Sequence, residues 1–152
     1  MYISAQADYA MCALIALAGS DTGRPVKADD LARSQELPTG FLENILGRLR
    51  RAGLVNSVRG AEGGYRLARS PSEITVAQVM RALEGPLAEV RGIRPESLTY
   101  EAPAERLQDV WVATRAALRM VLEQVTLAHI AEGALPPAVQ ELAADPDAWL
   151  PH

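Results

Sequence analysis

Cysteine and histidine are scarce in this chain: its 152 residues include one cysteine, Cys12, and two histidines. A lone cysteine excludes an intrachain disulfide and any Cys-x-x-Cys metal or redox site. No Cys–His or Ser–His–Asp set can be assembled around His129, and the single lysine, Lys27, lies outside any Gly-x-x-x-x-Gly-Lys phosphate loop. We therefore expect a protein that is not an enzyme and that has no cofactor.

Long apolar runs and aromatic side chains are also lacking. The most apolar stretch, residues 10–18, has about half of the ~20 residues that a membrane-spanning helix needs. The N-terminal residues lack the basic start and the apolar run of a secretory signal. We therefore expect a cytoplasmic protein with no membrane contact. Because hydrophobic residues make up 49% of the chain and aromatics only 5%, the core should consist of Ala, Leu and Val in packed helices.

Charge is distributed unevenly along the chain. The net charge of −4 argues by itself against a nucleic-acid binder. Residues 37–69, however, carry six arginines against two acids, a net charge of +4, whereas residues 70–152 carry six arginines against twelve acids, a net charge of −6. A basic segment followed by an acidic one suggests two roles in one chain, and clustering by chance is the simpler alternative.

Three segments near the start of the chain have helical patterns. Ser4 can cap a helix that ends near Gly19, and a short helix is expected at residues 28–34. After a tight connection, Pro38 opens a third helix, whose apolar residues lie three and four apart and which stops at Gly53. A short helix, a tight turn and a longer helix are the outline of a helix-turn-helix.

A β-hairpin is predicted directly behind this helix-turn-helix. Residues 54–59 alternate apolar and polar side chains, residues 60–64 form a glycine-rich loop, and residues 65–67 return as a strand. A hairpin in this position is a wing. Thr75 can cap a further helix that ends near residues 84–86.

The rest of the chain divides into a connector and a helical region. The connector has no clean periodicity, whereas residues 104–125 have an apolar stripe wide enough to be buried on two sides. Thr126 can cap a last short helical turn. We therefore predict a mostly α-helical fold with a small β-hairpin wing. Its parts are a winged helix-turn-helix domain at 1–86, a connector at 87–103, and a helical region with a tail at 104–152.

The stretch Arg-Gly-Ala-Glu-Gly-Gly-Tyr-Arg-Leu at 59–67 resembles the wing of the IscR/NsrR/CymR family of bacterial winged-helix regulators, also called the Rrf-two family. Three further segments are similar to that family: the opening helix at 4–13, the third helix and first strand at 42–55, and the helix behind the wing at 74–86. The similarity covers about residues 1–86 and continues more weakly along the C-terminal helix.

This resemblance implies a DNA-binding transcriptional regulator that dimerises through its long C-terminal helix. The candidate residues for the dimer seam are Trp111, Leu118 and Leu122. The best-known family members hold an iron–sulfur cluster with three closely spaced cysteines in the connector. Here residues 91–103 contain neither cysteine nor histidine, so we expect no such cluster.

Cys12 lies inside a predominantly apolar helix. We expect it to be buried and to behave as a small hydrophobe. Asp8 precedes it by four residues, on the same face of the helix. There are two alternatives: this pair could hold a metal or cluster that is shared between subunits, or Cys12 could be a redox-sensitive thiol.

The third helix should lie in the major groove and present its early residues to the bases. These residues are Thr39, Gly40, Glu43 and Asn44. Glu43 can accept a hydrogen bond from a cytosine amino group. The alternative is a helix-start acid that only complements the helix dipole.

Arginines and glycines supply the remaining expected DNA contacts. Phosphate contacts are expected from a cluster near the end of the third helix: Arg48, Arg50 and Arg51. A solvated helix end is the alternative. At the wing tip, Arg59 can enter a narrow minor groove, where negative potential is concentrated. Three glycines should permit tight turns and a close approach to DNA: Gly60, Gly63 and Gly64.

Together these patterns predict a homodimeric repressor that recognises a partly palindromic operator in double-stranded DNA. The alternative is a winged-helix module that binds a protein partner, with DNA binding weak or lost. A small acidic effector is a further candidate partner. Arg91 and Arg94, with Tyr100 nearby, could bind it, and solvated loop residues are the simpler alternative.

Overall fold

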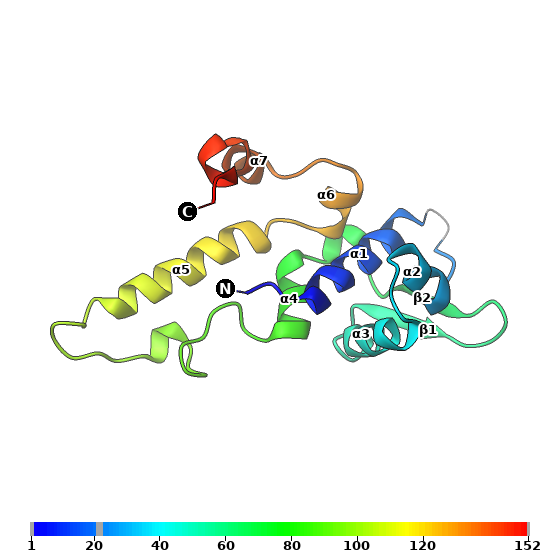
Figure 1. Cartoon of the computed structure of the whole chain (residues 1–152), viewed down its shortest axis with the longest axis horizontal. Helices are drawn as coiled ribbons and strands as arrows, with labels where there is room; N and C mark the ends of the chain where they lie inside the picture. The colour runs from blue at the N-terminus through cyan, green and yellow to red at the C-terminus, as the bar shows by residue number, and fades with distance from the viewer. Residues whose placement is uncertain (1, 21–22, 152) are drawn as a thin grey trace.

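The computed structural model describes residues 2–20 and 23–151. Figure 1 shows a helical body from which one long helix extends to one side and the hairpin loop to the other. Within the described residues, no helix combines the length and the apolarity that crossing a bilayer requires. The helices are α1 (Ala5–Gly19), α2 (Ala28–Ser34), α3 (Thr39–Arg51), α4 (Val76–Glu84), α5 (Leu107–Leu122), α6 (Leu127–Ala131) and α7 (Pro137–Ala144).

Two strands, β1 (Val55–Val58) and β2 (Gly64–Leu67), form an antiparallel hairpin. Three short 3-10 turns complete the elements: η1 (Pro71–Glu73), η2 (Pro95–Ser97) and η3 (Pro146–Trp149). The predicted mostly α-helical fold with a small hairpin wing behind a helix-turn-helix is therefore confirmed.

The body is built around α1. Ser4 caps this helix as predicted, since its hydroxyl oxygen accepts a hydrogen bond of 3.1 Å from the Ala7 backbone N–H. Ala7, Ala10 and Ala13 have no exposed surface, and α1 packs against α3, α4, α6 and β2. Because each alanine adds only a methyl group, the neighbouring elements approach closely. Larger side chains complete the core: Leu14, Leu42, Ile45, Leu46, Leu49, Ile74, Val79 and Leu127.

Cys12 lies on the opposite side of α1 from this core. The core-facing alanines and Leu14 leave Cys12 on the outer face of the helix, where it is exposed. The expected burial of Cys12 is therefore wrong. The apolar composition of α1 did not reveal this, because alanine is abundant on both of its faces.

Backbone hydrogen bonds from the segment before α2 hold the wing against the body. Its two strands pair in register from Val55 with Leu67 to Val58 with Gly64. In addition, Val26 and Tyr65 exchange backbone hydrogen bonds of 2.8 and 2.7 Å. The segment before α2 thereby forms an isolated β-bridge with β2, which fixes the loop-proximal part of the hairpin relative to the helix-turn-helix.

The connector is anchored to the body. Leu87, Pro95 and Leu98 are buried, and η2 packs against α5. The helix α5 is shorter than the predicted 104–125, because residues 104–106 form a bend and a turn ahead of it and residues 123–125 leave the helix at its other end. None of its described residues is buried, although it has the predicted apolar stripe. A large part of this stripe is therefore left uncovered within one chain.

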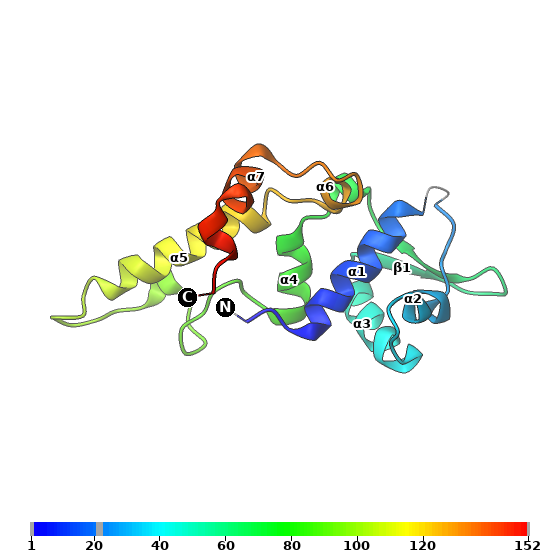
Figure 2. The same ribbon diagram turned by 45° about the horizontal axis from the view of Figure 1, so that its top comes forward.

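After α5 the chain returns to the body (Figure 2). Thr126 caps α6 as predicted, since its hydroxyl oxygen accepts a hydrogen bond from the His129 backbone N–H. Leu127 is completely buried, and its backbone N–H donates to the Ile74 carbonyl oxygen at 2.9 Å. Residues 126–131 thus pack with the winged domain, whereas α7 and η3 pack on each other and remain exposed.

Arg48 connects three helices of the body. Its guanidinium donates hydrogen bonds of 2.5 Å to the Gln6 side-chain oxygen on α1 and to the Leu83 backbone carbonyl on α4. The carbonyl of Leu83 belongs to the last turn of α4, where carbonyl groups lack partners within the helix. Arg48 satisfies this group in a partly buried place and thereby holds α3 against α1 and α4.

We predict that Arg48→Met lowers the free energy of unfolding by about 1–3 kcal/mol, because it leaves a partly buried carbonyl without its donor. Urea denaturation monitored by circular dichroism measures this change. Arg51→Met, on the exposed side of the same helix, is the matched control and should change stability by less than about 0.5 kcal/mol. Equal stability of the two variants would contradict the role assigned to Arg48.

Candidate nucleic-acid interface

The helix α3 has one buried and one exposed face. Leu42, Ile45, Leu46 and Leu49 are buried against the body. The opposite face is exposed along the length of the helix, and it is made by Gly40, Glu43, Asn44, Arg50 and Arg51. Five of the seven residues expected to contact DNA from this helix therefore share one outward face, while Thr39 and Arg48 lie at its margins.

Thr39 is held by α2 at the start of α3. Its hydroxyl donates a hydrogen bond of 2.7 Å to the Asp29 carboxylate on the first turn of α2. On the neighbouring side, Phe41 packs edge-on against Tyr9 of α1, with ring centroids 6.1 Å apart. The two contacts fix the first turn of α3 from two directions, and this rigidity suits a helix that must insert into a groove.

The wing presents Arg59 on a compact loop. Arg59 is exposed and precedes Gly60, whose φ of 105° favours glycine. A Cβ atom on Gly63 would lie 2.3 Å from the Val58 carbonyl oxygen, and one on Gly64 would lie 2.3 Å from the Val26 carbonyl oxygen. Gly63 and Gly64 are thus required by the packing of the hairpin itself, independently of any contact with DNA.

A hollow of about 380 Å³ lies between α3 and the wing. It brings together five of the residues expected at the interface: Thr39, Glu43, Gly60, Gly63 and Gly64. Asn44, Arg51 and Arg59 are exposed outside its lining. Arg50 is also exposed, and its guanidinium donates a hydrogen bond of 3.2 Å to the Ser57 hydroxyl on β1.

Two groups at this surface were missed in the sequence. Lys27, the N-cap residue of α2, is exposed and lines the hollow between α3 and the wing. A second hollow, of about 480 Å³, lies on β2 and includes Arg24, Arg66 and Arg69. The excess of arginine in residues 37–69 could have indicated Arg66 and Arg69, whereas only the fold brings Arg24 to them.

The residues expected at the dimer seam contact other parts of the same chain. The Trp111 indole N–H donates a hydrogen bond of 3.2 Å to the Tyr100 hydroxyl, Leu118 lines a hollow together with the connector, and Leu122 packs on the core. All three are half-buried. A different row on α5 is exposed, and its members follow heptad spacing: Val110, Ala113, Ala117 and Met120.

The residues expected to bind an acidic effector are separated in the structure. The Arg91 guanidinium lies over the Tyr100 ring, 5.9 Å from its centroid. Arg94 lines a different hollow, between α4 and α5. Arg91 and Tyr100 therefore engage each other, and Arg94 belongs to another group of side chains.

The family model that matches residues 3–133 is Rrf2, described as an iron-dependent transcriptional regulator. Among curated relatives, Rv1287 of Mycobacterium tuberculosis is 51% identical over 145 residues, which is 95% of this chain and 90% of that protein. The HTH-type transcriptional regulator CymR of Bacillus subtilis is 37% identical over 131 residues, or 86% of this chain and 90% of CymR.

Solved structures agree with these relatives. CymR (YrzC), the global cysteine regulator of B. subtilis, superposes with a TM-score of 0.74 at 35% identity, covering 88% of this chain and 98% of CymR. IscR of T. potens superposes with a TM-score of 0.70 at 34% identity, covering 88% of each chain.

The donor groups that the structure describes do not fit the metal that the family description names. The single cysteine, Cys12, is exposed on α1. Among residues 2–20 and 23–151, no three His, Cys, Asp or Glu side chains are grouped so that they could hold a metal ion. The match to the family model, the relatives and the winged fold nevertheless agree. The chain therefore belongs to the Rrf2 family and is a DNA-binding transcriptional regulator.

Proposed function

We propose that this protein is a homodimeric repressor in the cytoplasm that binds a partly palindromic operator sequence-specifically. The observation that carries the proposal is the exposed face of α3 next to the wing. Arg51 lies at the end of α3 and Arg59 lies on the wing loop, and both are exposed. Repression needs only occupancy of the operator, whereas activation needs an additional surface that contacts the polymerase. The proposal includes no catalytic step and no bound iron.

Residues of α3 and the wing have different roles in this proposal. Glu43 and Asn44 lie on the exposed face within reach of base edges in the major groove. Arg50, Arg51 and Lys27 contact phosphates on either side. Arg59 enters the minor groove from the wing tip. Arg48 is left out of these contacts, because both of its hydrogen bonds are made inside the body.

The exposed row on α5 supports the homodimer. Val110 and Met120 are 52% and 58% exposed, and both lie in the heptad row with Ala113 and Ala117 between them. Two copies of this row can pack as a helix pair, and the two alanines allow the helices a close approach. Trp111, Leu118 and Leu122 flank the pair from the inner side of each α5. Such a dimer places two recognition helices on one face of the DNA, about 34–36 Å apart.

Val110→Glu should convert the dimer into monomers, because it places a charge in the proposed apolar seam. Sedimentation velocity over a dilution series measures the change. Val112→Glu is the matched control: Val112 is 37% exposed and lies outside the heptad row, so this variant should remain dimeric. If both variants stay dimeric, the proposed seam is wrong.

Arg59→Ala should weaken binding to the DNA upstream of the protein's own gene by about tenfold. It should also make the slope of log affinity against log salt less negative by about 0.9, since one charge contact with DNA is lost. Fluorescence anisotropy across a salt series measures both quantities.

Arg106→Ala is the control for this measurement, because Arg106 is ion-paired with Asp109 at the far end of α5. This variant should bind DNA as the unchanged protein does. Binding by the unchanged dimer that is indifferent to DNA sequence would contradict the proposal and favour the alternative, a protein-interaction module.

Glu43→Gln should change which base is preferred at one position of each half-site. A carboxylate accepts from the cytosine amino group, whereas an amide can bond adenine with two hydrogen bonds, and such a pair discriminates by about 1–3 kcal/mol. Binding to a panel of single-base operator variants measures this preference. Arg51→Gln should instead weaken binding to every sequence alike. An unchanged preference in Glu43→Gln would show that Glu43 does not contact a base.

A further inference from the structure

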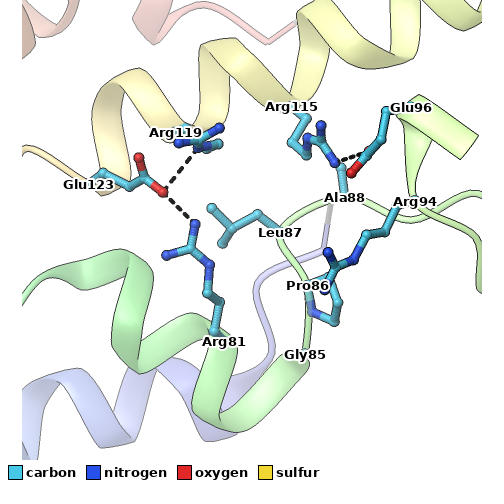
Figure 3. Close-up of a pocket in the computed structure, with 10 residues that line it drawn as sticks. All are labelled: Arg81, Gly85, Pro86, Leu87, Ala88, Arg94, Glu96, Arg115, Arg119 and Glu123. Carbon is cyan, nitrogen blue, oxygen red and sulfur yellow. Dashed lines mark hydrogen bonds and ion pairs between the residues drawn. The ribbon is translucent and has the colours of Figure 1, made fainter.

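A hollow of about 490 Å³ lies where α5 meets the body, between α4, the connector and α5. Figure 3 shows Arg81 on α4 facing Arg119 on α5 and Glu123 at the C-cap of α5, while Arg115 on α5 meets Glu96 of the connector. Arg94 enters from the connector beside the backbone of residues 85–88, which forms the remaining wall. None of these side chains belongs to the DNA interface proposed above.

The hollow gathers arginines from an acidic part of the chain. Residues 70–152 contain six arginines and have a net charge of −6, yet four of the six line this one hollow. They come from three separate segments: Arg81, Arg94, Arg115 and Arg119. Against two glutamates they leave a net charge of +2, which reverses the sign of the surrounding segment.

The two carboxylates occupy only part of this guanidinium cluster. The Glu123 carboxylate accepts hydrogen bonds from Arg81 at 2.5 Å and from Arg119 at 3.0 Å, and these bonds lower its pKa. Glu96 accepts from Arg115. Among the described residues, the Arg94 side chain makes neither a hydrogen bond nor an ion pair with another side chain, and its charge interacts with the Glu96 carboxylate only at longer range. The cluster therefore has one guanidinium without a hydrogen-bonding partner among the described residues, and a net positive charge.

We propose that this hollow binds a small dianion, either a dicarboxylate or a phosphomonoester of metabolite size. Its volume lies within the range of about 300–1,000 Å³ that is usual for small-molecule sites. Guanidinium groups bind carboxylates and phosphates through paired hydrogen bonds, and a dianion matches the net charge of +2. Leu87 and Pro86 offer apolar contact to the carbon skeleton of the ligand.

A ligand bound here connects the two parts of the molecule. Arg81 belongs to α4, which packs on α3, whereas Arg115 and Arg119 belong to α5. When these groups bind one dianion together, the orientation of α5 relative to α4 changes. In a dimer this also changes the separation of the two recognition helices. This regulatory consequence rests on the proposed function. By linkage, DNA and dianion must alter each other's affinity by the same factor.

Titration calorimetry on the full-length protein without DNA tests the site. The probes are succinate and malate for the dicarboxylates, glycerol 3-phosphate for the phosphomonoesters, and acetate as the monoanion, all at matched ionic strength. We expect at least one dianion to bind once per chain with a dissociation constant below about 1 mM, and acetate not to saturate. The preferred probe distinguishes the two ligand sources. Absence of saturable binding by every dianion would overturn the proposal.

Two variants separate this site from a general effect of positive charge. Arg94→Gln breaks no side-chain hydrogen bond or ion pair of the described residues and should weaken dianion binding at least about tenfold. Arg91→Gln removes another connector arginine, which faces Tyr100 instead, and should bind as the unchanged protein does. Equal losses in the two variants would overturn the proposal.

Anisotropy with DNA and no dianion completes the test. Arg94→Gln should bind DNA as tightly as the unchanged protein, and a weaker affinity would show that the hollow contacts DNA phosphates, which would overturn the proposal. Saturable dianion binding by a protein that does not bind DNA would support the anion site and contradict the proposed function. The failures of the two proposals are therefore distinguishable.

Discussion

The close packing of neighbours against α1 is the contact on which the rest of the body depends. Ala7, Ala10 and Ala13 are completely buried, and a larger side chain on this face would push α3 and α4 away from α1. The two hydrogen bonds of Arg48 need Gln6 and Leu83 within reach of one guanidinium, so they exist only at this separation. The exposed surface of α3 is thus positioned by small residues that lie behind it.

The elements that could be predicted are those whose signals are local in sequence. Ser4, Thr75 and Thr126 each precede an apolar pattern, and each caps a helix in the structure. The spacing of buried residues in α3 and the glycine at position 53 likewise determine that helix and its end without reference to distant residues. The order of helix-turn-helix, hairpin and long helix follows from these signals, and the family resemblance agrees with it.

What could not be predicted depends on how distant segments meet. Nothing near Val26 indicates that it pairs with Tyr65, and nothing near Arg48 shows that it turns inward while Arg51 stays outside. The sequence predicts a stripe on α5 wide enough to be buried on two sides, but only the course of the connector decides which side faces the chain itself. The arginines between α4 and α5 are separated by the connector in sequence, so their grouping also comes from the fold.

The return of the chain at α6 gives the long helix a mechanical property. Before α5, the connector is fixed by the burial of Leu87 and Leu98, and after α5 the chain is fixed by Leu127 in the core and by backbone bonds between residues 74–76 and 125–127. A helix held by the packing of η2 along its side and by the core just after its C-terminal end acts as a strut rather than as a hinged lever. It can tilt or rotate slightly about its own axis, but it cannot swing away from the winged domain without unseating Leu127. A displacement at the outer end of α5 is thereby transmitted directly to the first turn of α4.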